Sequence, residues 1–292
     1  MTLEQLRIFC AVAEALHMTR AAEHLGMTQS AVSAAINALE TRHGIRLFDR
    51  VGRGLALNSA GEAFLPEARA VLSRAEAAQM VLDDLAGLRR GLVRVYASQT
   101  IAAYWLPPRM AAFRARHPAI DLELRIGNTH QVIEALLNTE AELGLIEGAE
   151  DANQLERHAV GADRLIVVAS PAHPFAGRTR PLSAAELASL GWALRETGSG
   201  TRSEFESHLP DGLSANDLRV ELTLPSNEAI LTAVGAGQMV TAISELAARP
   251  LIEAGRLVQL PLELPERPFY RLRHRERALS HAAEAFVSAL TA

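Results

Sequence analysis

An unbroken heptad repeat of apolar residues follows the first 58 residues of the chain. Ser59 and Glu62 form a capping box, the serine-x-x-glutamate pattern that starts helices, and the run that it opens continues to about Ala86. The apolar positions, spaced 4, 3, 4, 3, 4 and 3 residues apart, are Phe64, Ala68, Val71, Ala75, Ala78, Leu82 and Leu85. A period of 3.5 residues lays one stripe of a helix against a partner, and the small residues in its middle allow close approach. At ~1.5 Å per residue this linker helix, within residues 59–88, is roughly 40 Å long. We expect it to join two chains, with packing inside one domain as the alternative.

Three shorter helices are predicted before the linker helix, within residues 1–58. The first has about three turns. Thr19 is expected to cap the second, Arg20–Leu25, and Gly26 to end it, because glycine accepts the left-handed backbone of a helix end. Thr28 is expected to cap the third. The apolar faces of the first and third helices are Leu3, Leu6, Phe9 and Val12, and Ala31, Val32, Ala35, Ile36 and Leu39. Two helices joined by a short turn with glycine form a helix-turn-helix.

The segment GIRLFDRVGRGLALN follows these helices and predicts a β-wing, since short apolar strands flank an arginine-glycine turn. In a helix-turn-helix the second helix enters the major groove of DNA, where the residues at its start reach base edges. Glutamine pairs bidentately with adenine, serine bonds to either class of base, and arginine suits phosphate. The candidate base contacts are Thr28, Gln29, Ser30 and Ser33, and the candidate phosphate contacts are Arg50 and Arg53. The alternatives are that Thr28 and Ser30 only cap the helix and that both arginines are solvated surface residues.

The net charge of −5 argues mildly against nucleic acid, because DNA-binding domains are usually basic. The charge is unevenly distributed, however. The segment from Arg42 to Gly61 holds one acid before Glu62, Asp49, and its basic residues are Arg42, His43, Arg46, Arg50 and Arg53. A local basic patch on an acidic chain suits a protein of which one small part meets phosphate.

Apart from histidine, every basic side chain is that of arginine, and the sequence has no lysine. A Walker A loop, a protein kinase and a pyridoxal-phosphate or Schiff-base enzyme all need a lysine, so these classes are excluded. The sequence also lacks the HExxH and GxSxG motifs, and GAGQMV matches only half of a dinucleotide-binding fingerprint. No cofactor is therefore expected.

Cys10 is the single cysteine, which excludes an intramolecular disulfide and a cysteine-based zinc site. It lies in the apolar stripe of the first helix, so we expect it to fill the core, with redox sensing as the alternative. The N-terminal residues contain acids and lack the basic start and apolar core of a signal peptide, and no apolar run approaches ~20 residues. We expect a cytoplasmic protein that lies beside the chromosome, in the nucleoid.

From Leu92 onward the pattern changes to alternating strands and helices. Strands are predicted at LVRVYAS, IDLELRIGN, ELGLIEG, RLIVVASP, WALRE, RVELTL, MVTAIS and the start of FYRLRHRER. Helices are predicted at 102–117, from Thr129 or His130 to Leu137, after Ser183 with Glu186 as its capping-box partner, after the glycine-rich turn and at the C-terminal end. Repeated strand-helix units predict parallel sheets. We expect residues 92–292 to form an α/β domain with a cleft between two lobes, about 92–162 with 267–292 and about 163–266.

The N-terminal pattern AAEHLGMTQSAVSAAINALE…LFDR…L…SAGE lies in a stretch of about 65 residues that resembles the DNA-binding domain of LysR-type transcriptional regulators. The remainder is similar to the two-lobed, periplasmic-binding-protein-like effector domain of that family, so the resemblance covers the whole chain. The segments ASQTIAAYWLPP, IGNTHQVIEALL, GLIEG, RETGSGTR and SNEAI…AVGAGQMV are most similar to a subgroup that regulates sulfur assimilation or the sulfite response, and regulators of carbon-fixation operons are close to it.

This resemblance implies an all-α winged helix-turn-helix with a long linker helix, followed by the α/β effector domain. It implies a transcriptional regulator and not an enzyme, with operator DNA, a small effector and further copies of itself as partners. Dimers would form through the linker helix and tetramers through the sensor domains. Contact with RNA polymerase stays open.

Three strand-to-helix turns are expected to meet at the cleft. Ligands of open α/β sheets bind beyond the carboxyl ends of strands, where helix N-termini attract anions. The candidate effector ligands are Ser98, Gln99, Thr100, Asn128, Thr129, Glu147, Ser199, Gly200, Thr201 and Arg202. These hydroxyls, amides and one arginine suit a small anion, and the subgroup resemblance alone suggests sulfite or another sulfur oxyanion. Closure of the lobes on the anion would change the angle between linker helices.

Several alternatives stay open for this site. Each turn could be ordinary helix capping. Glu147 either screens the ligand or bonds across the lobes, and His130 is a surface residue or a proton switch. A solute-binding protein would explain the second domain but not the helix-turn-helix. An enzyme with Ser199 or Thr201 as nucleophile lacks a recognisable general base. The sequence leaves the operator, the regulated genes and the choice between activation and repression open.

Overall fold

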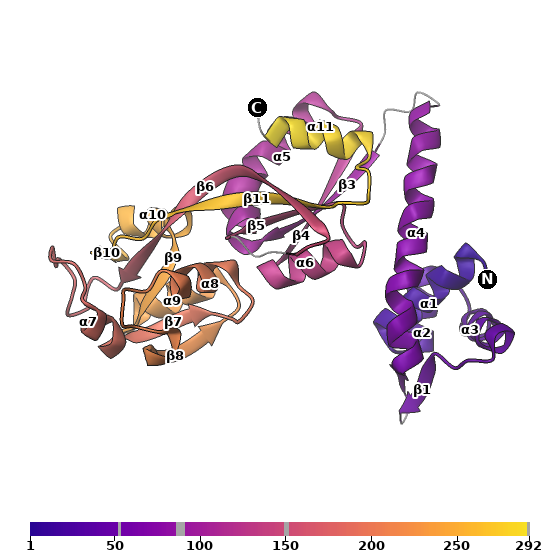
Figure 1. Cartoon of the computed structure of the whole chain (residues 1–292), viewed down its shortest axis with the longest axis horizontal. Coiled ribbons are helices and arrows are strands. Elements are labelled where there is room, and N and C mark those ends of the chain that lie inside the picture. The colour runs from indigo at the N-terminus through magenta and orange to yellow at the C-terminus, as the bar shows by residue number, and fades with distance from the viewer. Residues whose placement is uncertain (52–53, 86–90, 149–151, 291–292) are drawn as a thin grey trace. The chain divides into compact units, whose positions relative to one another are not determined.

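The computed structural model describes residues 1–51, 54–85, 91–148 and 152–290. Arg53, one of the predicted phosphate contacts, lies outside the described residues. The chain divides into two compact units, residues 1–88 with 138–140 and residues 89–137 with 141–292 (Figure 1). No helix of the described ranges is long and apolar enough to cross a bilayer.

The first unit begins with three helices, α1 (Leu3–Ala15), α2 (Met18–Leu25) and α3 (Gln29–His43). The predicted caps are right for α3 and wrong for α2. The Thr28 hydroxyl accepts the backbone N–H of Ala31, but α2 starts two residues earlier than expected, at Met18, and is capped by the His17 ring, which accepts from Thr19. Gly26 ends α2 with a φ of 64°, so the glycine at the turn is required by the backbone.

The wing is the antiparallel pair β1 (Phe48–Val51) and β2 (Gly54–Leu57), as the sequence predicted. The core of the first unit is built from one face of α1 with α2, α3 and the wing, and Phe9 at its centre is fully buried. Cys10 lies in this core. Burial raises the pKa of its thiol to about 11, which opposes formation of the reactive thiolate and favours the core role over redox sensing.

The linker helix α4 spans Ser59–Leu85. Its cap lies one residue before the predicted capping box, because the Asn58 side chain accepts the backbone N–H of Gly61. The first two seam positions belong to the unit's own core, since Ala68 is buried and the Phe64 ring centroid lies 5.0 Å from that of Phe9. The predicted seam from Phe64 to Leu85 is therefore wrong at its start, and the side chain of Leu85 lies outside the described residues.

The second unit contains one long sheet with the strand order β4-β3-β5-β11-β6-β9-β7-β8, and β10 pairs with β6. These described strands are β3 (Gly91–Ser98), β4 (Ile120–Gly127), β5 (Leu143–Glu147), β6 (Leu155–Ala169), β7 (Gly191–Arg195), β8 (Arg219–Leu224), β9 (Val240–Ser244), β10 (Val258–Leu260) and β11 (Glu266–His274). The strands β6 and β11 run side by side across the unit in opposite directions (Figure 1).

The prediction of parallel sheets is right for the outer strands and wrong for the crossing strands. β3 is parallel to β4 and β5, and β7 is parallel to β8 and β9, whereas β6 and β11 are antiparallel to their neighbours. The chain leaves one half of the sheet in β6 and returns in β11, which fixes their opposite directions. The first part of β6, with the sequence LERHAVGA, is half exposed and charged, so it lacks the apolar pattern of a strand.

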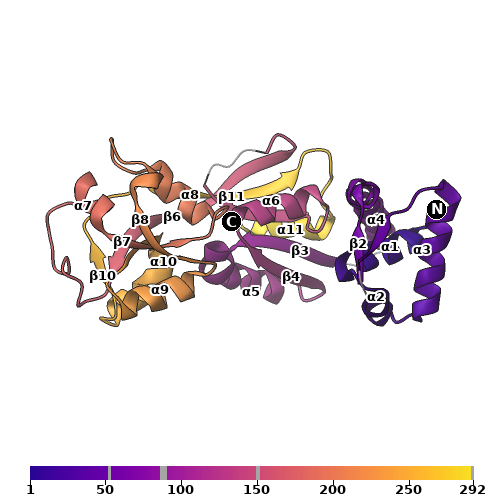
Figure 2. The same ribbon diagram turned by 90° about the horizontal axis from the view of Figure 1, so that it is seen from below.

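Four apolar clusters divide this unit into two lobes. Lobe I contains β3, β4 and β5 with the π-helical turn η1 (Ile101–Trp105) and the helices α5 (Leu106–Arg116), α6 (Thr129–Leu137) and α11 (His281–Leu290). Lobe II contains β7 to β10 with α7 (Ala184–Ser189), α8 (Gly200–Ser207), the 3-10 turn η2 (Ala215–Asp217), α9 (Asn227–Ala236) and α10 (Glu245–Glu253). In lobe II, α7 and α8 cover one face of the sheet, and α9 and α10 cover the other (Figure 2). The sequence predicted neither α9 nor α10, and it merged η1 and α5 into one helix.

Candidate functional site

The predicted base contacts lie together at the start of α3. Gln29 and Ser30 are exposed and Ser33 is half-buried. The Thr28 hydroxyl caps α3, which is the capping role considered as its alternative, and the Ser30 hydroxyl lies 3.1 Å from it without capping the helix itself. Arg50, on β1 of the wing, is exposed and so free to approach phosphate.

A single glutamate joins α3 to the wing. Glu40, near the end of α3, accepts backbone N–H groups from Leu47 at 2.7 Å and from Phe48 at 3.4 Å. At the same end of the hairpin, Asn58 donates to the Arg46 carbonyl at 3.0 Å. The bonds of Glu40 hold α3 and the wing in a fixed arrangement. The predicted DNA contacts, which lie on these two elements, are therefore also fixed relative to each other. The sequence analysis missed Glu40, which looks like any other acid near the end of a helix.

The predicted hydroxyl ligands are all buried at the ends of strands or the starts of helices. In lobe I, Ser98 ends β3, Thr129 begins α6, and Glu147 ends β5. In lobe II, Ser199 and Thr201 flank Gly200 at the start of α8. The exposed fractions are 2% for Ser98, 0% for Thr100, 0% for Thr129, 2% for Glu147, 2% for Ser199 and 2% for Thr201.

Two of these hydroxyls, Ser98 Oγ and Thr129 Oγ1, have no hydrogen-bond partner within the described parts of the chain. A buried polar atom without a partner is costly and rare. The start of α8 lies directly against Thr129: a Cβ atom on Gly200 would lie 2.5 Å from Thr129 Oγ1 and 2.6 Å from the Glu147 carbonyl oxygen. Only glycine therefore allows lobe II to approach lobe I this closely.

A buried ion pair holds the crossing strands beside the same turn. Arg267 on β11 and Asp163 on β6 form two hydrogen bonds of 2.8 Å, and Ser244 donates to Asp163 at 2.6 Å. Burial alone would lower the pKa of Arg267, but Asp163 and the nearby charges of Glu147 and Glu204 outweigh it, so the net direction is upward. Arg267 also donates to Thr201 Oγ1 at 3.0 Å. The sequence analysis did not predict this ion pair.

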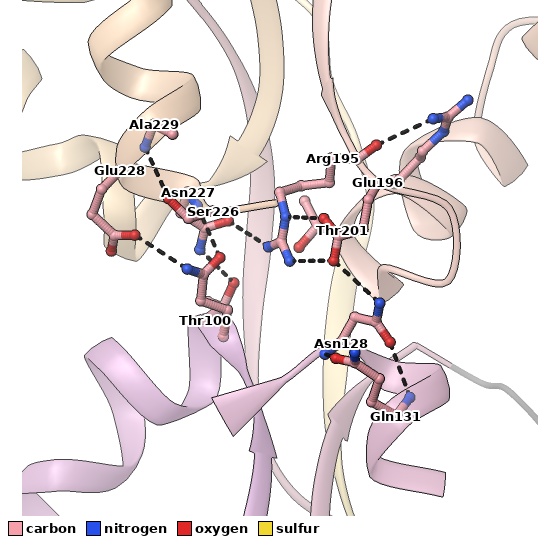
Figure 3. Close-up of polar contacts among 12 residues, drawn as sticks. Thr100, Asn128, Gln131, Arg195, Glu196, Thr201, Ser226, Asn227, Glu228 and Ala229 are labelled. Carbon is pink, nitrogen blue, oxygen red and sulfur yellow. Dashed lines mark hydrogen bonds and ion pairs between the residues drawn. The ribbon is translucent and has the colours of Figure 1, made fainter. Parts of the chain in front are cut away.

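Three further predicted ligands of lobe I bond directly to lobe II, and Figure 3 shows two of them, Thr100 and Asn128. Thr100 accepts from Asn227 at 3.2 Å, and Asn128 donates to Glu196 at 3.2 Å. Gln99 accepts from the backbone N–H of Asn227 at 2.8 Å. On each side of the site, side chains of lobe I thus meet side chains of lobe II.

Two charged groups differ from expectation. Arg202 donates to Glu206 at 2.7 Å and to the Arg195 carbonyl at 3.2 Å, so its guanidinium is committed to its own helix and strand. Arg195, which was not predicted, is 4% exposed and reaches Asn227 at 2.8 Å. His130 is exposed beside Glu134, as expected of a surface residue.

Two family models match the chain. The model described as the bacterial regulatory helix-turn-helix protein, lysR family, matches residues 3–62, and the LysR substrate binding domain matches residues 86–292. The second match covers more than two thirds of the chain.

Individual relatives agree with the family models. An uncharacterized HTH-type transcriptional regulator, YeiE of Escherichia coli strain K12, is 36% identical over 98% of this chain and 96% of its own length. A RuBisCO operon transcriptional regulator of Allochromatium vinosum is 34% identical over 98% of this chain and 94% of its own length. Among solved structures, the regulatory domain of Synechocystis PCC6803 CcmR in complex with 2-PG is 27% identical, has a TM-score of 0.60, and covers 69% of this chain and 96% of that domain.

These matches and the winged helix-turn-helix with its two-lobed partner domain agree along the whole chain, which therefore belongs to the LysR family of DNA-binding transcriptional regulators, whose second domain binds an effector.

Proposed function

We propose that this LysR-type regulator binds a small oxyanion between the lobes of its second domain, with sulfite or a related sulfur oxyanion as the leading class. The start of α3 reads the operator, with Gln29, Ser30 and Ser33 on base edges and Thr28 shared between base and cap. Arg50 and Arg53 anchor phosphate. The exposed part of the α4 seam pairs two chains.

The observation that carries the effector proposal is the pair of buried hydroxyls without partners, Ser98 Oγ and Thr129 Oγ1. Both come from lobe I, at the end of a strand and the start of a helix. Such atoms are explained by a ligand that completes their hydrogen bonds. A ligand that accepts hydrogen bonds fits, because every hydroxyl can donate.

Two more hydroxyls support an acceptor. Thr100 Oγ1 accepts from Asn227, and Thr201 Oγ1 accepts from Arg267. A hydroxyl that accepts in this way keeps its own proton to donate. Amides at the start of α8 add donors, since the first N–H groups of a helix have no acceptor within the helix. Hydroxyl and amide donors with a helix N-terminus suit an oxyanion.

Within the oxyanions, an organic phosphate is the second candidate. The CcmR regulatory domain, which matches this second domain, was solved with 2-PG, and a RuBisCO operon regulator is among the relatives. The buried charge of Glu147 near Arg267 leaves little net positive charge at the cleft. This balance favours recognition by hydrogen bonds over recognition by charge.

Calorimetry on the full-length protein tests the proposal with sulfite in anaerobic buffer, sulfate, phosphate and 2-PG. We expect one of these anions to bind. The Thr129→Val substitution should lower its affinity by at least about tenfold, roughly 1.4 kcal/mol. Thr232→Val, at an exposed threonine of α9, is the matched control and should leave the affinity unchanged. Binding of none of the four anions, or equal effects of the two variants, would show that this cleft does not sense an oxyanion.

A further inference from the structure

The first turn of α9 holds an asparagine with three committed groups. Asn227 is fully buried. Its side-chain Nδ2 donates to Thr100 at 3.2 Å, its Oδ1 accepts from Arg195 at 2.8 Å, and its backbone N–H donates to Gln99 at 2.8 Å. Figure 3 shows it between Thr100 of lobe I and Arg195 of lobe II. One residue thereby joins the two lobes by side chain and by backbone.

The next residue extends this junction. Glu228 accepts from the Tyr104 hydroxyl at 2.9 Å and from Gln99 Nε2 at 3.2 Å. Gln99 is therefore held at both ends of its amide, by the Asn227 backbone and the Glu228 carboxylate. Burial, and then the bond to Glu228, raise the pKa of Tyr104, so its hydroxyl keeps the proton that it donates.

An apolar contact accompanies these polar ones. The ring of Tyr104, which belongs to η1 of lobe I, packs against the lobe II cluster formed by α9, α10 and their strands. The contact combines a partly buried ring with a charge-assisted hydrogen bond to Glu228.

A second junction lies at the other turn of the cleft. Asn128 donates to Glu196 at 3.2 Å, and the backbone N–H of His130 donates to the Gly198 carbonyl at 3.2 Å. Glu196 is fixed in turn by Arg195. Since Arg195 also reaches Asn227, the two junctions are linked through one guanidinium.

We propose that Asn227 and Glu228 are positioning residues of the effector cleft, which hold lobe II against Gln99, Thr100 and Tyr104 and thereby set the affinity for the anion. The inference rests on the proposed function for its ligand but not for its contacts, which join protein atoms to protein atoms. When a binding-competent arrangement is only partly populated, the apparent affinity falls by that fraction. Weakening the junction therefore lowers the affinity for the anion without removing any side chain that binds it.

Backbone amide hydrogen exchange reads this junction directly. Asn227 and His130 stand at the starts of α9 and α6, where N–H groups have no acceptor within their own helix. Their protection from exchange therefore reports the bonds to Gln99 and Gly198 of the opposite lobe. The measurement uses the full-length protein and needs no effector.

Three variants test the contact from both lobes. Tyr104→Phe removes only the hydroxyl on lobe I, Glu228→Ala removes the acceptor on lobe II, and Glu228→Gln keeps an acceptor oxygen. Glu221→Ala is the matched control, since this exposed glutamate of β8 pairs with Arg219 within lobe II. We expect exchange at Asn227 to rise about fivefold or more in Tyr104→Phe and Glu228→Ala, less in Glu228→Gln, and not in the control.

Calorimetry with the same four anions completes the test. The tightest of them should bind Tyr104→Phe and Glu228→Ala about three- to tenfold more weakly, in step with the rise in exchange. Tyr104→Phe is decisive, because it lies outside α9 and cannot act by loosening that helix. Unchanged exchange at Asn227 in this variant, or an affinity that does not follow the exchange, would overturn the proposal. If exchange rises while no anion binds to any form, the junction stands and the oxyanion function fails.

Discussion

At the residue scale, the two partnerless hydroxyls connect stability with function. Ser98 and Thr129 are as buried as core leucines, yet their oxygens bond to nothing within the described chain. Such atoms destabilise the fold unless another molecule satisfies them. Removing a hydroxyl that binds a ligand should thus raise the stability of the ligand-free protein.

Thr129→Val replaces the hydroxyl by a methyl group of nearly the same shape. We expect the free energy of unfolding without anion to stay equal or rise by about 1 kcal/mol, because a buried unsatisfied oxygen is removed. Denaturant unfolding with an unchanged m-value measures it. A loss of more than about 1 kcal/mol would mean that Thr129 has a structural partner and is not reserved for an effector.

At Gly200 we expect a substitution to disturb the packing of the lobes. Because glycine has no side chain, α8 lies so close to Thr129 and Glu147 that a Cβ atom at this position would clash with both. Gly200→Ala should push the lobes apart and weaken anion binding by at least about tenfold. Gly177→Ala, at a glycine with open space around it, is a control for general alanine effects, although its φ of 75° adds backbone strain of its own. Equal affinity in Gly200→Ala would exclude a tight approach of α8.

At the element scale, α3 and the wing together carry the proposed DNA contacts. Gln29 starts the helix and Arg50 lies on the strand, so they test base and phosphate contacts separately. Gln29→Ala should cost about 1–3 kcal/mol on the operator and far less on random DNA. Arg50→Ala should weaken both about equally and reduce the salt slope by about one. Equal losses on both DNAs for Gln29→Ala would remove it from the base contacts.

Glu40 tests whether the two parts must be held together. Glu40→Ala leaves the backbone N–H groups of Leu47 and Phe48 without their acceptor while touching no predicted DNA contact. We expect operator affinity to fall about tenfold, with partial recovery in Glu40→Gln, which keeps one acceptor oxygen. Binding titrations at fixed salt measure this, and circular dichroism checks that α3 stays helical. Full affinity in Glu40→Ala would show that the wing is positioned without it.

At the scale of the whole molecule, α4 is the element that we propose to join two chains. Val71 and Leu82 remain 43% and 60% exposed, although both lie on the apolar heptad seam. Since they take no part in the core of the first unit, we expect a helix of a second chain to bury them. Two chains joined there would present two DNA-reading units to a two-fold symmetric operator.

The double variant Val71→Glu with Leu82→Glu places charges in that seam, where they cannot be solvated. Light scattering should show particles of smaller mass, and operator affinity should fall, while the thermal stability of the first unit stays nearly the same. Ala63→Glu, at an exposed position of α4 outside the seam, is the control. Unchanged mass and affinity in the double variant would mean that the seam does not join chains.

Much of the fold follows from local patterns of the sequence alone. The helix-turn-helix, the wing, most strands of the two lobes and the capping box at Ser183 all depend on neighbours a few residues apart, whereas β10 and the first half of β6 were not predicted. The positions of Ser98, Thr129 and Thr201 at strand and helix ends follow for the same reason. The hydroxyl side chains that make up the candidate effector site could therefore be listed from the sequence alone.

Only the tertiary structure decided which of these groups are free and which are engaged. Phe64 continues the heptad, yet its ring packs on Phe9 of the same chain. Thr100 and Thr129 are both buried hydroxyls at helix starts, but Asn227, which is 127 residues from Thr100 in the sequence, bonds to Thr100 and not to Thr129. Periodicity and capping are set by near neighbours, whereas hydrogen-bond satisfaction depends on residues that folding brings together from distant parts of the chain. This is why the sequence could name the candidate ligands but not separate the anion's partners from the residues that hold the lobes together.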